Sequence, residues 1–375
     1  MNVTRDISES IKGDLRTKMV FIGGPRQVGK TTLSKMFLSQ KSLYLNWADL
    51  SDRALIKTHK IPPNVKILIL DEVHKYRLWR TLLKGLYDKF SQDLTIIVTG
   101  SARLDLFKKG GDSLFGRYHY YRLHPFTLSE VDKKMGRKTT LRLLDYGGFP
   151  EPFLRQDMVF YRRWTRERIS RVVFQDIRDL ENVNDLGKLD LLVDALPERV
   201  GSSFSMRSLA EDLEVSPNTI KHWMEILEKV YYSYRILPYG APKIRAVKKN
   251  PKIFLWDWAE IKDPGAKYEN LVASQLLKYC HYMEDTLGYK MELRYLKDVD
   301  SREVDFVVLR DKKPQFGVEC KTGDRAISKH IRYFKSRTSI PQFYQVHLGE
   351  QDYEEPGIRV LPFESFCRQL LLLQS

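Results

Sequence analysis

The stretch that most constrains this chain is a glycine-bounded loop between an apolar run at residues 18–23 and a helical segment at residues 32–38. Two glycines separated by four residues, with Lys and Thr after the second, fit the phosphate-loop pattern. Glycine lets successive backbone N–H groups point at phosphate oxygens, and the helix N-terminus adds the positive end of its dipole. The sequence therefore predicts a nucleotide site. Its predicted binding residues are Gly24, Pro25, Arg26, Gln27, Val28, Gly29, Lys30, Thr31 and Thr32.

A pair of acids, Asp71 and Glu72, closes a second apolar strand about 40 residues after the loop, the spacing expected of a phosphate-loop protein. Phosphoryl transfer depends mostly on positioning and on charge stabilisation. We expect Lys30 to reach the β- and γ-phosphates, and Thr31 and Asp71 to hold Mg²⁺. Glu72 would orient the attacking water. The predicted cofactors are therefore ATP and Mg²⁺.

Strands that alternate with helices through residues 1–135 indicate a doubly wound parallel sheet. Five motifs occur along the chain: GPRQVGKTT at 24–32, LDEVHK at 70–75, TGSAR at 99–103, LHPFTLSE at 123–130 and YGGFPE at 146–151. Together they resemble prokaryotic AAA-type P-loop ATPases that carry a C-terminal domain of unknown function. The resemblance spans nearly the whole chain, and it implies an AAA-type ATPase core at residues 1–135.

Four polar residues in or after the predicted strand at residues 94–100 are further candidates. Related ATPases place a polar γ-phosphate sensor where Thr99 or Ser101 stands. Arg103 and Arg117 are candidates for an arginine that stabilises the transition state, within one subunit or from a neighbouring one. The alternative for either is an ordinary surface arginine.

The middle of the chain is predicted to hold a helical lid or connector at residues 136–185 and a winged helix-turn-helix at residues 186–258. The connector is arginine-rich, which fits a solvated face, a phosphate backbone or a subunit contact equally well. In the second unit Ser205 and Ser216 are candidate N-caps of two helices. The second of these helices would present Asn218, Thr219, Lys221 and His222 outward. A stretch without acids at residues 241–252 would form the wing, with Lys243, Arg245, Lys248 and Lys249.

Net charge bears on whether this unit binds DNA. The chain carries a formal net charge of +15, which favours a polyanionic partner. Winged helices also serve as protein–protein modules, so that alternative stays open. We expect duplex or branched DNA, held mostly through phosphates and weakened by salt.

The last third, residues 259–375, resembles restriction-endonuclease-like α/β domains in the order and spacing of its acids. Asp305 lies in one predicted strand, and Glu319 and Lys321 share a face of the next because strand side chains alternate. Asp305, Glu319 and the Cys320 carbonyl would bind Mg²⁺, Lys321 would position or activate water, and Glu269 would assist from a helix. The alternative is an inactive scaffold of the same fold.

The leading hypothesis is an ATPase that binds DNA and cuts it with Mg²⁺. The alternatives are a ring-forming DNA-remodelling motor that does not cut, and a nucleotide-operated switch that binds another protein. We expect a homo-oligomer, and no membrane span because no apolar run approaches ~20 residues. Three scattered cysteines and the absence of a secretory signal predict a cytoplasmic setting.

Overall fold

The structure is a computed structural model that describes residues 3–58, 61–90, 93–100, 114–177, 185–202, 205–240 and 250–374. Among these residues no helix is both long and apolar enough to cross a membrane.

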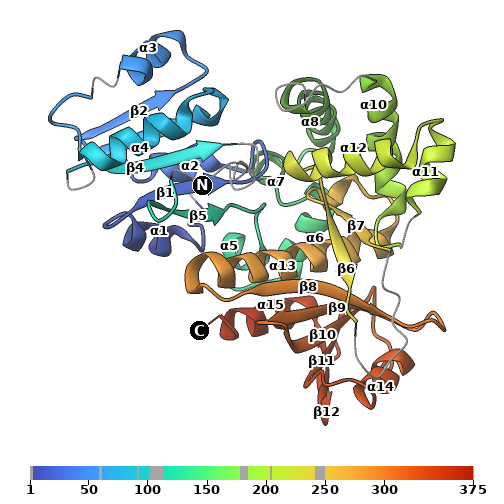
Figure 1. The fold of residues 1–375 in the computed structure, drawn as a ribbon. Coiled ribbons are helices and arrows are strands. Elements are labelled where there is room, and N and C mark those ends of the chain that lie inside the picture. The colour runs from blue at the N-terminus through green and yellow to red at the C-terminus, as the bar shows by residue number, and fades with distance from the viewer. Residues whose placement is uncertain are drawn as a thin grey trace.

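The N-terminal part is a five-stranded parallel sheet in the order β2-β3-β4-β1-β5 (Figure 1). Its strands are β1 (Met19–Gly23), β2 (Ser42–Asn46), β3 (Ile67–Asp71), β4 (Thr95–Gly100) and β5 (Tyr118–Arg122). The helices around it are α1 (Ser8–Asp14), α2 (Lys30–Lys35), α3 (Leu50–Thr58), the short 3₁₀ turn η1 (Val73–Lys75) and α4 (Trp79–Phe90). The predicted α/β class and parallel sheet are confirmed.

Side chains of this sheet alternate between two apolar cores, one on each face. In β1, Val20 and Ile22 belong to one core, with Leu33 of α2, whereas Phe21 belongs to the other, with Leu82 of α4. Strands buried on both faces read as continuous apolar runs, which is why the sequence pattern was so plain here. Because all five strands are parallel, their carboxyl ends meet at one edge, and the phosphate loop lies there.

A helical segment follows the sheet, made of α5 (Leu128–Val131), α6 (Arg137–Tyr146), α7 (Pro150–Arg155), α8 (Met158–Arg171) and a π-helical turn η3 (Val172–Asp176). The Asp157 side chain caps α8 by accepting from the backbone N–H groups of Val159 and Phe160. Most arginines of α8 are exposed, but Arg168 is buried and pairs with Glu260 and Asp257. This pairing ties the helical segment to the middle of the chain.

Three helices then form the middle unit: α10 (Leu186–Ala195), extended by the 3₁₀ turn η4 (Leu196–Arg199), α11 (Met206–Asp212) and α12 (Pro217–Lys229). Both predicted N-caps are present: Ser205 accepts from the N–H of Ser208, and Ser216 from that of Thr219. A hairpin of β6 (Ser233–Pro238) and β7 (Lys252–Leu255) follows.

The hairpin belongs to an eight-stranded sheet in the order β12-β13-β11-β10-β9-β8-β6-β7. Its other strands are β8 (Met291–Lys297), β9 (Glu303–Arg310), β10 (Lys313–Lys321), β11 (Phe343–His347), β12 (Tyr353–Glu355) and β13 (Ile358–Pro362). The helices are η5 (Trp258–Glu260), α13 (Pro264–Leu287), α14 (Lys329–Lys335) and α15 (Phe363–Leu372). Since β6 pairs with β8 through Leu237 and Pro238, one sheet continues across the boundary predicted at residues 258–259.

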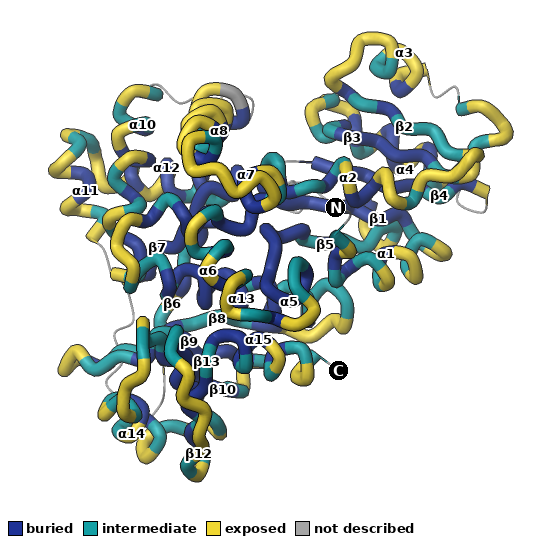
Figure 2. The backbone as a smooth tube through the Cα atoms, turned by 180° about the vertical axis from the view of Figure 1, so that it is seen from behind, coloured by how far each residue is buried: buried dark blue, intermediate teal, exposed yellow. Residues whose placement is uncertain are grey.

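Helix α13 lies between the two sheets and contacts both β5 and β8 (Figure 1). One buried apolar cluster extends from α1 and β1 through α12 and α13 to β10 and α15. Seen from behind, the backbone is buried along this central path and exposed over α3, α8 and α11 (Figure 2). The parts of the chain therefore share one continuous core around α13.

Asn270 of α13 clamps strand β7 from inside this core. Its fully buried amide accepts from the Leu255 N–H and donates to the Leu255 carbonyl, both at 2.8 Å. Asn270→Ala leaves both backbone groups without these partners, so we expect it to lower the free energy of unfolding by about 3 kcal/mol. Urea denaturation measures this, and Asn218→Ala at an exposed position is the control. An Asn270→Ala loss no larger than the control's would contradict the clamp.

Candidate functional site

A cleft of about 520 Å³ opens at the carboxyl edge of the parallel sheet, beside the phosphate loop. Gly24 and Gly29 adopt φ values of 151° and 98°, which other residues rarely take. A Cβ at Gly24 would also overlap the carbonyl oxygen of Leu123. The cleft is lined by Arg26, Gln27, Gly29, Lys30, Thr31, Thr32, Asn46, Ala48, Asp71, Glu72, Lys75, Pro150 and Glu151.

Lys30 is the buried cation of the loop. Its Nζ donates to the carbonyls of Gly24 at 2.9 Å and Pro25 at 2.7 Å. Burial lowers the pKa of Lys30 to about 8, although Glu72 and Asp71 oppose this shift. The ammonium is therefore held inside the loop by its own backbone, which places it among the N–H groups that the glycines orient.

Three hydroxyl groups converge on the Asp71 carboxylate. Thr31 and Tyr44 each donate to Oδ2 at 2.7 Å, and Thr99 donates to Oδ1. Thr31 and Asp71 are the oxygen donors that Mg²⁺ prefers, and Mg²⁺ in such sites takes one or two carboxylates plus phosphates and water. The pair therefore fits the predicted ion. Tyr44 was not predicted, because nothing in its own strand distinguishes it from a core aromatic.

Glu72 follows Asp71 in a left-handed backbone conformation, with φ of 57°, and lines the cleft. Burial alone would raise the pKa of Glu72, but His74, Lys30 and Lys75 together lower it below its usual value. The Lys75 ammonium lies 3.3 Å from the carboxylate. Glu72 is thus kept ionised at the edge of the cleft, as a residue that orients water must be.

A residue far along the chain holds one residue of the phosphate loop. Arg26 donates to Asp176 of the π-helical turn at 2.6 Å, and the two residues stand 150 positions apart. A second pocket, of about 150 Å³ and mostly apolar, adjoins the cleft and shares Gly29, Thr32 and Pro150 with it. Its other lining residues are Val3, Arg5, Leu33, Met36, Phe126 and Leu154.

One candidate arginine lies at the wrong edge for a role within its own subunit. The Arg117 carbonyl accepts from the N–H of Met19, at the amino ends of the strands and opposite the phosphate loop. Its guanidinium pairs with Asp88 at 2.8 Å. Parallel strands place their two ends a strand length apart, so Arg117 cannot reach a nucleotide in the same copy. Arg103 and Ser101 lie outside the described residues.

Some of the DNA-binding candidates lie within the described residues and others lie outside them. Asn218, Lys221 and His222 are exposed near the start of α12, and Thr219 is half-buried there. The predicted wing residues Lys243, Arg245, Lys248 and Lys249 lie outside the described residues.

The four acid-site candidates of the C-terminal domain come together between α13, β9 and β10. Asp305 Oδ2 accepts from the Cys320 N–H at 2.7 Å, and Lys321 donates to Glu319 Oε1 at 2.8 Å. The predicted shared face of Glu319 and Lys321 is therefore present. The second oxygen of Glu319 is buried and has no hydrogen-bond partner among the described residues.

A buried lysine that sequence reasoning missed stands among these acids. Lys252 of β7 lies 3.0 Å from Glu269 and 4.0 Å from Asp305, and it also contacts Glu303. Its role could not be predicted from the sequence, because it ends the basic stretch at residues 241–252 that was assigned to the wing. The described residues contain no group of three His, Cys, Asp or Glu side chains arranged to hold a metal ion. As arranged, the Lys252 ammonium pairs with Glu269 and Glu303 and lies close to Asp305, so part of the negative charge of the cluster is already neutralised.

Burial keeps two of the acids from ionising easily. It raises the pKa values of Glu319 and Glu269 to about 8, with the nearby Asp305 carboxylate adding to the shift. Lys321 and Lys252 offset only part of this effect. At neutral pH the cluster therefore holds protons that free carboxylates would have lost.

This gives Glu319→Gln a pH-dependent effect on stability. A carboxyl group with a folded pKa near 8 and an ordinary value of 4.5 favours the folded state below pH 4.5, and that contribution is lost as pH rises to 8. Glutamine does not ionise, so the Tm of the variant should match wild type near pH 4.5 and exceed it by about 5 °C at pH 8. Calorimetry at both pH values tests this. Exposed Glu354→Gln should show no such trend, and a lower Tm for Glu319→Gln at pH 8 would contradict the shift.

Comparisons with known proteins divide the chain in three. Residues 16–132 match the model of a family described as AAA domain. Residues 137–259 match "Domain of unknown function (DUF8612)", and residues 264–366 match "Domain of unknown function (DUF4143)".

Relatives span most of the chain. An uncharacterized protein of Methanocaldococcus jannaschii is 22% identical over 96% of this chain and 86% of its own length. One of Haemophilus influenzae is 25% identical over 76% and 78%.

Among solved structures, C. elegans PCH-2 aligns with a TM-score of 0.23 at 14% identity, over 59% of this chain and 65% of that one. Drosophila ORC bound to DNA aligns with a TM-score of 0.25 at 12% identity, over 59% and 64%. The chain thus contains an AAA-type ATPase-like domain followed by two domains whose families have no described function.

Proposed function

We propose that this chain binds ATP with Mg²⁺ and hydrolyses it in the cleft beside the phosphate loop. One observation carries the proposal: the Thr31 hydroxyl donates to Asp71 at 2.7 Å, at the edge where the loop and its buried Lys30 lie. These residues come from α2 and β3, which are separated in sequence and joined only by the fold. Their agreement with the AAA domain match supports nucleotide chemistry.

Each residue of the cleft has a distinct role in this proposal. Loop N–H groups and Lys30 bind the phosphates, and binding replaces the loop carbonyls that hold the ammonium. Thr31 and Asp71 hold Mg²⁺, which neutralises charge that develops on the phosphate oxygens. Thr99 and Tyr44 fix the Asp71 carboxylate by donating to it. Glu72 orients the attacking water, and the adjoining apolar pocket takes the base.

Lys30→Met tests the site. Methionine keeps the length of the side chain but removes the charge, so we expect ATP hydrolysis to fall on the order of 100-fold. Steady-state phosphate release measures turnover, and Lys290→Met, at an exposed position outside the cleft, is the control. Turnover that is unchanged in Lys30→Met, or undetectable in wild type, would count against the proposal.

For the rest of the chain we propose DNA binding without cleavage. Support for binding comes from the net charge of +15 and from the exposed polar residues at the start of α12, the second of two helices with serine N-caps. Support against cleavage comes from Lys252, whose ammonium pairs with Glu269 and Glu303 and lies 4.0 Å from Asp305, one of the two carboxylates predicted to bind the metal. Assembly into an oligomer, with Arg103 or Arg117 acting on a neighbouring copy, stays a prediction.

Lys221→Ala should weaken duplex DNA binding equally for all sequences and reduce the salt dependence of log K by about one. Fluorescence anisotropy at several salt concentrations measures this, with Lys290→Ala as the control. Wild type should leave supercoiled plasmid intact in Mg²⁺. Cutting that Asp305→Ala abolishes would restore the nuclease hypothesis, and no binding at low salt would favour a protein-binding switch.

A further inference from the structure

A buried arginine near the N-terminus holds the phosphate loop from behind. Arg5 donates through Nη1 to the Val28 carbonyl at 3.2 Å, through Nη2 to the His124 carbonyl, and through Nε to Glu130 at 3.0 Å. Val28 lies in the loop, between the two glycines that shape it. Arg5 therefore connects the loop to two residues of the segment that follows β5.

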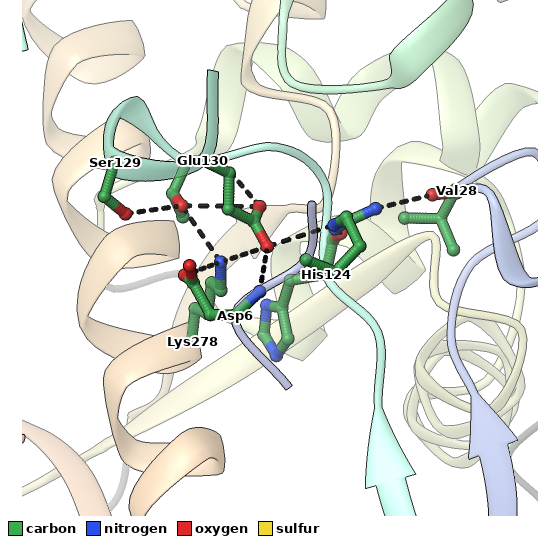
Figure 3. A network of polar contacts seen from close by, with 8 residues as sticks. Asp6, Val28, His124, Ser129, Glu130 and Lys278 are labelled. Atoms are coloured by element: carbon green, nitrogen blue, oxygen red, sulfur yellow. Dashed lines mark hydrogen bonds and ion pairs between the residues drawn. The ribbon is translucent and has the colours of Figure 1, made fainter. Parts of the chain in front are cut away.

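Glu130 is the centre of this network, as Figure 3 shows. It is buried, and Oε1 accepts from Arg5 and from the backbone N–H of Asp6 at 3.2 Å. Lys278 of α13 lies 2.9 Å from the same oxygen. Lys278 also donates to Asp6 at 2.8 Å and to the Thr127 hydroxyl at 2.9 Å. The lysine thus joins a segment before β1 to one after β5.

The charges in this network balance only when Lys278 is present. Arg5 and Lys278 oppose Glu130 and Asp6, two of each sign. A buried carboxylate that loses one partner is costly, because its remaining charge is left in a medium of low polarity. Burial alone would raise the pKa of Glu130, but Arg5 and Lys278 together lower it to about 2. Glu130 therefore stays ionised, and its geometry depends on both cations.

Further contacts fix α13 against the same segment. His124 Nε2 and His281 Nδ1 lie 2.8 Å apart, and Arg122 pairs with Glu284 at 2.7 Å and with Asp285. The first turns of the same helix carry Glu269, which binds Lys252 of the acid cluster. One helix of 24 residues thus contacts both candidate sites.

We propose that Lys278 is a positioning residue of the nucleotide site, and that the C-terminal domain, through this residue, sets part of the affinity for nucleotide. The contacts run from Lys278 to Glu130, from Glu130 to Arg5, and from Arg5 to the Val28 carbonyl of the phosphate loop. This inference rests on the proposed ATP binding. Coupling between sites is reciprocal, so a partner that shifts α13 changes nucleotide affinity by the factor by which nucleotide changes affinity for that partner.

Lys278→Met removes the ammonium and keeps the length of the side chain. We expect the Kd for AMP-PNP with Mg²⁺, measured by calorimetric titration on the full chain, to rise about tenfold. KM for ATP should rise likewise while kcat falls less than about threefold, because Glu72 is untouched. Lys290→Met, just beyond the same helix, should bind as wild type does.

A double-mutant cycle separates positioning from loss of stability. Glu130→Gln alone should also weaken binding, and Lys278→Met with Glu130→Gln should bind no worse than the weaker single variant, because both act through one contact. Purely additive effects on Kd would overturn the proposal. So would a folded Lys278→Met whose Kd lies within about twofold of wild type.

A substitute variant and a hydrogen-exchange measurement complete the test. If Lys278→Met does not fold, Lys278→Gln, which can still donate to Thr127, takes its place under the same criteria. In wild type, AMP-PNP with Mg²⁺ should slow hydrogen exchange at residues 274–285 of α13, and unchanged exchange there would overturn the inference. Absence of nucleotide binding by wild type would instead refute the proposed function.

Discussion

A charge removed from water has to be paired, and buried cations of the described residues, with Arg5 among them, obey this constraint where parts of the chain meet. Arg168 joins α8 to the segment after β7, Lys278 joins α13 to the N-terminal segment, and Lys252 joins β7 to α13 and β9. Pairs of this kind do not add much stability over apolar packing of the same shape. They disfavour arrangements that separate the pairs, because a buried charge would then lack its partner.

The two candidate sites differ in how that constraint is met. In the nucleotide cleft the cation, Lys30, is held by backbone carbonyls, which a phosphate can replace. In the acid cluster the cation, Lys252, is held by carboxylates of its own chain. The first arrangement leaves the charge available to a ligand, whereas the second uses it internally. The cleft is thus suited to binding and releasing an anion, whereas the ion pairs of the acid cluster leave Lys252 no need of a ligand.

The sequence allowed prediction of features that depend on neighbours in the chain. The loop, Asp71 and the caps at Ser205 and Ser216 all follow from short patterns of glycine, apolar and capping residues. The shared face of Glu319 and Lys321 follows from strand alternation. Tyr44, Asp176, Lys252 and Lys278 could not be found in this way, because their contacts are with partners that strand order and helix packing bring together.

Arg117 is a residue whose local sequence suggested a role that its place in the sheet does not allow within the same copy of the chain. It follows a glycine and precedes a strand, so its position in the sequence suited a catalytic arginine. The phosphate loop follows the carboxyl end of β1, and β5 runs parallel to β1. Arg117 comes just before β5, so it lies at the opposite edge of the sheet from the loop. A local pattern carries no information about that edge.

The pairing of β6 with β8 joins the second and third matched segments of the chain into one structural unit. The junction between the second and third matched families falls at residues 259–264, yet the sheet crosses it. A segment that ended there would leave the edge of β8 without its neighbour, and an unpaired edge invites association with other chains. The two segments are therefore not free to be shuffled as separate modules.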